Sequence, residues 1–273
     1  MNQDVVTLNL EDEKVSYKMC LNEDYKNLIG KTGVPYEYEI LKDMISRIPK
    51  GSLVLDIGMH IGNHSLFLAA NGFKVIAFEA NGKYASYAKA SMQLNDFDKK
   101  VTIYDFGLSN KNETLFCQEN GITLFDGQET QPGCIQVNCK TLDGLNIKEK
   151  VALIKIDVEG MEHKVIGGGA KLIEKNRPII YLEGNTFPEL SRSSRILEKM
   201  NYVCWDSFDE APTHLFLPLE MVSEREMLVR CMTKLALNHV GNSPVKQNTW
   251  ANFAFDEIYK AIFEIKSLIG SGR

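Results

Sequence analysis

Short apolar runs alternate with stretches of helical periodicity between residues 52 and 183. The apolar runs are SLVLDI (52–57), KVIAFE (74–79), VTIYDF (101–106), VALIKID (151–157) and PIIYLE (178–183). Their near-continuous apolarity is what a strand buried on both faces requires. Helical patterns fill the intervals and follow the last run: His64–Ala70, Lys83–Leu94, Glu162–Lys175 and Pro188–Lys199. This alternation predicts βαβ units and a mostly parallel sheet.

Two further runs extend this sheet. YVCWDSF (202–208) and THLFLPL (213–219) are separated by the short turn DEAP, which predicts an antiparallel pair. The expected fold is therefore α/β, with a seven-stranded, mostly parallel sheet whose last strand is antiparallel. Between the third and fourth strands, ETLFCQ (113–118) and CIQVNCKTL (134–142) predict additional β-structure inserted at the edge.

The two ends of the chain differ from this repeating pattern. Residues 1–50 predict one or two strands and then a helix over Tyr38–Ile48 that stops before Pro49. Residues 220–273 contain two amphipathic helical patterns, Glu220–Asn238 and Ala251–Leu268. We expect an N-terminal cap (1–50), a ligand-binding domain (51–219) and a helical extension (220–273) that covers the domain or joins copies of the chain in a homo-oligomer.

Composition narrows the class of protein. Apolar residues make up 44% of the chain and charged residues 25%, as in globular cytoplasmic proteins. The net charge of −5 argues against a nucleic-acid partner, because phosphate neutralisation needs concentrated Lys and Arg. No apolar run approaches the roughly 20 residues of a membrane span, and the first residues lack the layout of a signal peptide. The six cysteines form no CxxC pair, which favours free thiols.

The first strand leads directly into a glycine-containing loop, Asp56–Gly62. Gly58 and Gly62 permit a sharp turn and close approach of a ligand, and the next helix presents unpaired N–H groups to it. The spacing is D-x-G-x-x-x-G and not the dinucleotide fingerprint G-x-G-x-x-G. Asp56 would repel a pyrophosphate but suits the amino group of S-adenosylmethionine. We therefore expect S-adenosylmethionine as the cofactor.

Acidic and aromatic residues end the next two strands. Glu79, which lies 23 residues after Asp56, is placed to accept hydrogen bonds from both hydroxyls of a ribose, and we expect the next residue, Ala80, to contact the cofactor as well. Asp105 and Phe106 end the third strand, where an adenine would lie. The acid could accept from the adenine amino group, and the aromatic ring could cover the base.

A further charged cluster ends the fourth and fifth strands. In an extended chain, Lys155, Asp157 and Glu159 lie on one side, and Glu183 ends the neighbouring strand. A hydroxyl that attacks a methyl group gains from a general base, for which Asp157 and Glu159 are the first candidates. We also expect Lys155 to take part in catalysis, Asp157 to contact the cofactor, and Glu159 and Glu183 to hold hydroxyls of the substrate. His163 is a third candidate for this role. A divalent ion on Asp157, Glu159 and Glu183 is chemically possible, but the sequence does not require it and assigns no metal ligand.

These blocks together resemble the FkbM family of methyltransferases. The resemblance covers roughly residues 36–184 and rests on LVLDIGMHIGNHSLFLA, VIAFEANGKYASYAKASMQLN, YDFGLSN and LIKIDVEGMEHKVIGGGAKLI followed by RPIIYLEG. It implies a Rossmann-like class I methyltransferase fold, S-adenosylmethionine as methyl donor, and usually O-methylation of a sugar or polyketide hydroxyl.

The resemblance also assigns roles to individual residues. Matching blocks give Asp56, Gly58, Gly62 and Glu79 as cofactor-binding residues and Lys155, Asp157, Glu159 and Glu183 as the rim of the active site. Glu37 matches an acidic position just before the family's domain and would fold over the cofactor. The loop departs from the family at Met59-His60, where Ala-Asn is more common. Either an altered cofactor contact or a replacement of the asparagine by His60 would explain this difference.

The favoured function is O-methylation of a saccharide or of a glycosylated small molecule, with a carboxylate as general base or with a carboxylate-bound metal. Two other hypotheses remain open. One is a nicotinamide-dependent oxidoreductase, which the missing third glycine and Asp56 oppose. The other is a non-catalytic scaffold that binds partners through residues 220–273.

Overall fold

The computed structural model describes residues 4–125, 133–208, 212–227 and 230. The chain divides into two compact units, Met1–Leu219 and Glu220–Arg273. Most of the second unit, including the two predicted C-terminal helices beyond residue 230, lies outside the described residues. The prediction of an oligomer through these helices therefore remains a prediction.

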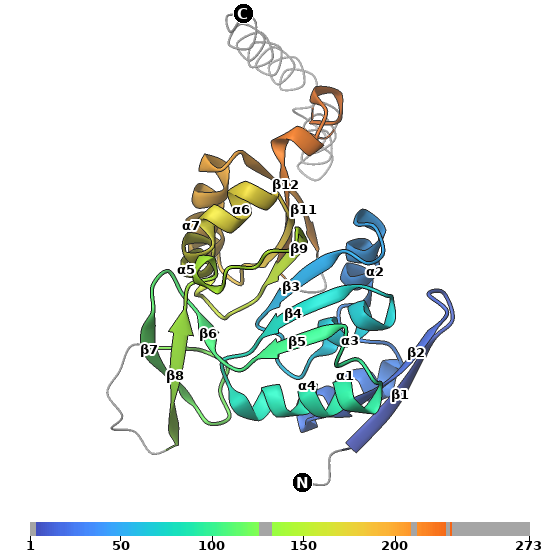
Figure 1. Ribbon diagram of the computed structural model, residues 1–273. Coiled ribbons are helices and arrows are strands. Elements are labelled where there is room, and N and C mark those ends of the chain that lie inside the picture. Colours follow the sequence, from blue (N-terminus) through green and yellow to red (C-terminus); the bar gives the residue numbers. More distant parts are fainter. Residues whose placement is uncertain (1–3, 126–132, 209–211, 228–229, 231–273) are drawn as a thin grey trace, which may run out of the picture. The chain divides into compact units, whose positions relative to one another are not determined.

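The first unit is built on a seven-stranded sheet (Figure 1). Across the sheet its strands are β11 (Tyr202–Phe208), β12 (Thr213–Pro218), β10 (Ile179–Glu183), β9 (Val151–Ile156), β3 (Leu53–Ile57), β4 (Lys74–Phe78) and β5 (Val101–Tyr104). The five strands from β10 to β5 are parallel, and β12 is antiparallel to both of its neighbours. The predicted fold is confirmed: an α/β, Rossmann-like class I sheet with an antiparallel last strand.

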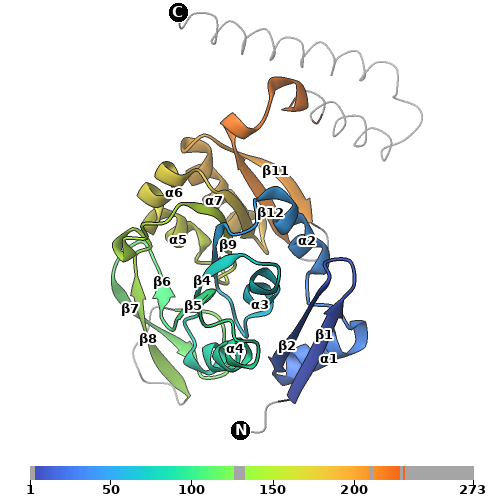
Figure 2. The same ribbon diagram turned by 45° about the vertical axis from the view of Figure 1, so that its right-hand side comes forward.

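Helices cover both faces of this sheet (Figure 2). On one side lie α2 (Tyr38–Arg47), α3 (Asn63–Ala70) and α4 (Gly82–Leu94). On the other lie α5 (Glu162–Gly168), α6 (Ala170–Asn176) and α7 (Phe187–Lys199). The one helix predicted over residues 162–175 is two helices. A Cβ at Gly168 would lie 2.1 Å from the backbone oxygen of Ser109, so this glycine lets the chain pass close to the neighbouring loop where the helix is interrupted.

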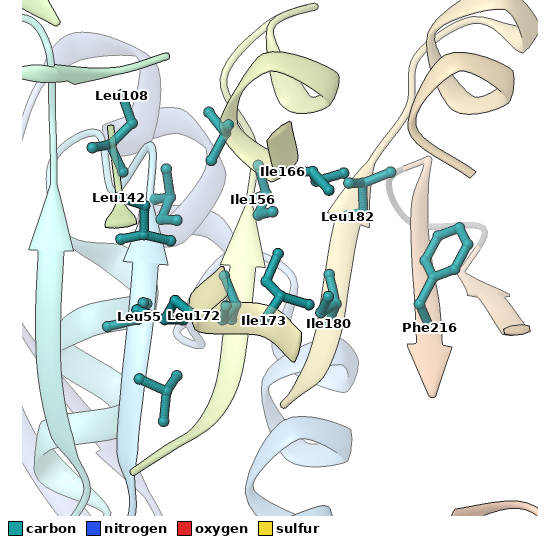
Figure 3. Close-up of a cluster of buried hydrophobic side chains, with 14 of the residues drawn as sticks. Leu55, Leu108, Leu142, Ile156, Ile166, Leu172, Ile173, Ile180, Leu182 and Phe216 are labelled. Carbon is teal, nitrogen blue, oxygen red and sulfur yellow. The ribbon is translucent and has the colours of Figure 1, made fainter. Parts of the chain in front are cut away.

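The core between α5, α6, α7 and the sheet consists mainly of aliphatic side chains, joined by the aromatic rings of Phe78, Tyr202 and Phe216 (Figure 3). Leu55 of β3, Ile156 of β9 and Ile180 of β10 meet Ile166 of α5 and Ile173 of α6, and all five are essentially inaccessible to solvent. Burial of this kind stabilises by about 25 cal/mol per Å² of apolar surface. It holds the carboxyl ends of the parallel strands in fixed positions.

Two smaller sheets flank the main one. The strands β1 (Asp4–Leu10) and β2 (Val15–Leu21) form an antiparallel hairpin that packs on α3 and α4. The predicted insertion consists of β6 (Gly107–Leu108), β7 (Glu113–Gln118) and β8 (Cys134–Lys140), which form a separate three-stranded sheet. It begins three residues after β5 ends, so it stands at the carboxyl edge of the main sheet.

The N-terminal region contains one helix that the sequence pattern did not predict, α1 (Glu23–Thr32). Only Ile29 of this helix is fully buried, so its apolar face is too narrow to give a clear periodic signal. Short 3₁₀ turns occur at Asp143–Leu145 and Leu219–Met221. Among the described residues no helix combines the length and apolar character of a membrane span, and the five described cysteines are free thiols.

Candidate functional site

A cavity of about 280 Å³ lies at the carboxyl ends of β3, β4, β9 and β10. The sequence-predicted residues that line it are Glu37, Gly58, His60, Glu79, Ala80, Phe106, Asp157, Glu159 and Glu183. The predicted residues that do not line it are Asp56, Gly62, Asp105, Lys155 and His163. Ligands of parallel α/β sheets gather at this edge, so the cavity is the candidate active site.

The loop after β3 forms one wall of the cavity. The backbone N–H groups of Gly58 and Met59 both donate to the Phe78 carbonyl of β4, at 2.9 and 3.0 Å. Gly58 has a φ of 81°, and a Cβ there would lie 1.7 Å from the backbone oxygen of Asp157. Only glycine permits this contact between the loop and the end of β9. Gly62 instead lets α3 start close to Ala88 of α4, which a Cβ would approach to 2.9 Å.

Asp56 lies behind this loop and is fully buried. The Ser65 hydroxyl donates to Asp56 Oδ2 at 2.5 Å, and Lys155 Nζ lies 3.8 Å from Asp56 Oδ1. Sequence reasoning placed this carboxylate at the cofactor. In the structure it contacts Ser65 and Lys155 instead. Lys155 in turn donates to Asp157, which lines the cavity.

Lys155 joins the loop to the acidic residues. Its buried Nζ donates to the Gly58 carbonyl and to Asp157 Oδ2, both at 3.0 Å. Burial opposes the charge on this ammonium, but Asp157 and Asp56 outweigh it, and the pKa of Lys155 is raised. A buried cation with these partners fixes the loop and the carboxylate relative to each other. The predicted alternation of Lys155, Asp157 and Glu159 on one side stops here, because β9 ends at Ile156.

Glu79 follows β4 and lies at the floor of the cavity. One carboxylate oxygen accepts from the Asn81 N–H at 2.8 Å and the other from the His60 N–H at 2.9 Å. Burial raises the pKa of Glu79 to about 7 in spite of these hydrogen bonds. Each oxygen retains a lone pair for a ligand hydroxyl, as two ribose hydroxyls would require.

His60 is the least typical residue of the loop, and it has a positive φ of 53°. Its ring lies between Tyr25 and Tyr84, with ring centroids 5.4 and 4.2 Å away. Burial, followed by the charge of Lys155, lowers the pKa of His60 to about 4. The imidazole is therefore neutral near pH 7 and packs as an aromatic ring.

The structure separates Asp105 from Phe106. Asp105 forms an exposed ion pair with Lys89 at 2.9 Å, and the hydrogen bond from Lys89 lowers its pKa. Phe106 lines the cavity, and Lys140 Nζ lies 4.3 Å from the centroid of its ring. Only the aromatic member of this pair faces the proposed adenine position.

Three carboxylates converge on the opposite side. Asp157, Glu159 and Glu183 each offer one oxygen, and these oxygens lie within 4.8 Å of one another. Burial and the hydrogen bond with Asp157 raise the pKa of Glu183, whereas Lys155 and that hydrogen bond outweigh burial and lower the pKa of Asp157. Asp157 is thus the ionised member of the pair and Glu183 the protonated one. Hard cations prefer such oxygen ligands, so the three residues could also hold a divalent ion.

Glu159 is in the left-handed region with a φ of 55°, where a non-glycine residue is strained. Burial and Asp157 raise its pKa. The buried Glu162 carboxylate holds this turn, since one of its oxygens accepts from the N–H groups of Val158 and Gly160 at 3.1 and 3.0 Å. His163 lies in the first turn of α5, outside the cavity lining, and burial lowers its pKa.

The N-terminal segment closes the remaining side. Glu37 has a φ of 57°, and its Oε2 lies 3.0 Å from His64 Nε2. Burial opposes its charge, but His64 outweighs it and lowers the pKa of Glu37. Tyr36 is tied to Asn63 by two hydrogen bonds at 3.1 and 2.8 Å. Tyr25 and Tyr36 also line the cavity but were not predicted to, because nothing in their local pattern distinguishes them from packing aromatics.

Comparisons with known proteins give the chain's relationships. The family model for the methyltransferase FkbM domain matches residues 56–215. A solved structure of methyltransferase FkbM from Methylobacillus flagellatus is 15% identical, with a TM-score of 0.48, over 62% of this chain and 43% of that one. A tRNA (uracil(54)-C(5))-methyltransferase of Pyrococcus horikoshii is 24% identical over 48% of this chain and 31% of its own length. The chain thus spans less than half the length of these two relatives.

The family match includes the loop after β3, Glu79, the turn after β9 and Glu183, which line the cavity, whereas Tyr25, Tyr36 and Glu37 of the lining lie outside it. Membership confirms the predicted cofactor, S-adenosylmethionine, and decides against the nicotinamide-dependent oxidoreductase. The chain belongs to the FkbM family of methyltransferases.

Proposed function

We propose that this methyltransferase acts on a hydroxyl of a sugar, in a polysaccharide or a glycosylated small molecule, with Asp157 as general base. The observation that carries this proposal is the convergence of Asp157, Glu159 and Glu183 within 4.8 Å, at the edge of the cavity formed by the Gly58 loop. An ionised carboxylate beside the cofactor loop is what a hydroxyl nucleophile requires.

The lining residues fit the cofactor. When bound, S-adenosylmethionine supplies an electrophilic methyl group on its sulfur. The Gly58 turn, which has no side chain, would accommodate the amino-acid portion, with the Glu37 carboxylate beside it. Glu79 would accept from the ribose hydroxyls, while Phe106 and Ala80 would contact the adenine.

Asp157 would take the proton of the acceptor hydroxyl as that oxygen gains the methyl group that the bound cofactor would supply, with S-adenosylhomocysteine as the other product. Lys155 keeps this carboxylate ionised and oriented, because its Nζ donates to Asp157 Oδ2 and to the loop at the same time. Glu159 and Glu183 hold neighbouring hydroxyls of the acceptor.

The charges and aromatic residues around the cavity favour an uncharged acceptor that contains a ring. Among the described residues that line the cavity none is Lys or Arg, which disfavours the phosphates of RNA although RNA methyltransferases are among the relatives. Phe187 begins α7, four residues after Glu183, and is 82% exposed. The capping box of Thr186 and Glu189 fixes the backbone of this turn. A sugar ring can stack on such a surface.

A divalent ion on the same three carboxylates is the second version of this mechanism. The approach of their oxygens to within 4.8 Å of one another favours such an ion. Activity that is lost on dialysis against EDTA and restored by Mg²⁺ would select this version, and activity unaffected by EDTA would select the metal-free base.

The acceptor is tested with a panel of sugars and glycosides. S-adenosylhomocysteine formation and the product mass are followed, and the position of the methyl group is read by NMR. We expect an O-methyl sugar, and we expect Phe187→Ala to raise the KM for the acceptor by about tenfold, as the loss of about 1.4 kcal/mol of ring contact implies. Methylation of a nitrogen or carbon atom, or of RNA, would contradict the proposal.

The pH dependence of cofactor affinity tests the role of Glu79. Its pKa of about 7 lies above the ordinary value, so the carboxylate that ribose hydroxyls need is present above pH 7 and is lost as the pH falls through 7. We expect the Kd for S-adenosylhomocysteine to rise up to about tenfold between pH 8 and pH 6. Isothermal calorimetry measures this change, and Glu79→Gln should abolish the pH dependence. An equal pH dependence in that variant would assign it to another group.

A further inference from the structure

Tyr25 is a cavity residue with no assigned role, and its ring is rigidly held. It lies in the first turn of α1, where its N–H donates to the capping Asn22 side chain at 3.1 Å. Its ring packs on His60, with centroids 5.4 Å apart, and meets the edge of Tyr36 at 5.9 Å. A ring fixed by a helix cap and two aromatic neighbours directs its hydroxyl to a fixed position.

The hydroxyl of Tyr25 is available to a ligand. The side chain lines the cavity, and this oxygen has no hydrogen bond within the part of the chain that the structure describes. The charged groups that act on it are Lys155, Glu37 and Asp157. Burial raises the pKa of Tyr25, so the hydroxyl remains a donor throughout the neutral range.

The amino-acid portion of the cofactor needs acceptors and donors side by side. Its ammonium and carboxylate groups are bonded to one carbon atom, so their partners must be close neighbours. Glu37 and the Gly58 carbonyl supply acceptors on this side of the cavity. Because no Lys or Arg is among the described lining residues, the carboxylate must find neutral donors.

Tyr25 is the neutral donor that lies beside these acceptors and on the loop. Tyr36 also lines the cavity, but its ring packs on Tyr25, whereas the ring of Tyr25 packs directly on His60 of the loop. His60 supports the Tyr25 ring from within the loop. We propose that the Tyr25 hydroxyl donates a hydrogen bond to the carboxylate of the cofactor's amino-acid portion, which makes α1 part of the cofactor site.

Two ligands distinguish a hydrogen bond from Tyr25 to the cofactor's amino-acid portion from a role of Tyr25 in ring packing alone. S-adenosylhomocysteine carries the amino-acid portion, whereas 5′-methylthioadenosine retains the adenosine and lacks that portion. Tyr25→Phe keeps the ring on His60 and removes only the hydroxyl. We expect its Kd for S-adenosylhomocysteine to rise about tenfold, as a lost hydrogen bond to a charged group predicts, and its Kd for 5′-methylthioadenosine to stay within about twofold.

Tyr84→Phe is the matched control, because Tyr84 packs on the same imidazole at 4.2 Å while its hydroxyl donates to the Asn120 carbonyl at 2.8 Å. Neither ligand should change affinity in this variant by more than about twofold, since its hydroxyl lies outside the cavity lining. An unchanged Kd for S-adenosylhomocysteine in Tyr25→Phe, or equal losses for both ligands, would overturn the proposal.

A second measurement avoids the loss of the hydroxyl. Replacement of Tyr25 by 3,5-difluorotyrosine keeps the shape and lowers the pH at which the hydroxyl ionises. The affinity for S-adenosylhomocysteine should then fall more steeply with rising pH than in the wild type, and the affinity for 5′-methylthioadenosine should not. Parallel pH profiles for the two ligands would contradict the proposed contact. The inference depends on the cofactor and not on the sugar acceptor, so failure of the acceptor assay leaves this test intact.

Discussion

Asp157→Asn is expected to lower kcat by about a thousandfold, the middle of the range that general-base catalysis contributes. The amide retains the size of the carboxylate and an oxygen that can accept from Lys155 Nζ, so the loop should keep its position. It cannot take the hydroxyl proton at neutral pH. The measurement is the rate of S-adenosylhomocysteine formation with the acceptor that the sugar panel identifies, together with the calorimetric Kd for S-adenosylhomocysteine, which should change by less than about threefold.

The matched control is Asp105→Asn, the same chemical change at a carboxylate that the structure places outside the cavity lining, in the exposed ion pair with Lys89. It should leave kcat and cofactor affinity unchanged, because Asp105 does not line the cavity. It should also cost little stability, because exposed ion pairs contribute about 0–1 kcal/mol. If Asp157→Asn retained more than a tenth of the wild-type kcat, Asp157 would not be the base. Glu159 and a metal-bound mechanism would then be the remaining candidates.

The fold was predictable because its signals are local. Each buried strand is a short apolar run, and Gly58 of the first loop follows such a run directly. The helix at Glu23–Thr32 was missed because only Ile29 is fully buried. The break between α5 and α6 was missed because its cause is the approach of Ser109, almost 60 residues earlier in the chain.

The site was predictable where residues directly end a strand, as at Glu79 and Glu183. The direction of each side chain was not predictable, because it depends on partners that are distant in sequence. Asp56 accepts a hydrogen bond from Ser65 and lies 3.8 Å from Lys155 Nζ. Lys155 in turn donates to the carbonyl of Gly58, which is 97 residues away in the chain. No spacing in the sequence distinguishes a strand-end carboxylate that faces a ligand from one that lies behind the loop.

Gly58→Ala is expected to abolish measurable cofactor binding and to destabilise the protein strongly. The new Cβ would lie 1.7 Å from the backbone oxygen of Asp157, so the loop and the end of β9 would have to separate by more than 1 Å. A displacement of this size at an active site costs about a hundredfold in function, and it would also disturb the hydrogen bonds of Lys155 to both segments. The strain should cost about 4 kcal/mol, which corresponds to a fall in Tm of about 10 °C.

Gly72→Ala separates this clash from the general cost of alanine at a positive φ. Gly72 has a φ of 90°, close to the 81° of Gly58, but a Cβ there would meet no atom within 4 Å. It should cost about 1 kcal/mol and about 3 °C, with normal affinity for S-adenosylhomocysteine. The two variants are compared by differential scanning calorimetry and by cofactor titration below their melting temperatures. Equal effects would show that backbone strain alone is responsible. A much larger fall in Tm and in cofactor affinity for Gly58→Ala would show that direct contact between the loop and β9 fixes the position of the cofactor site relative to Asp157.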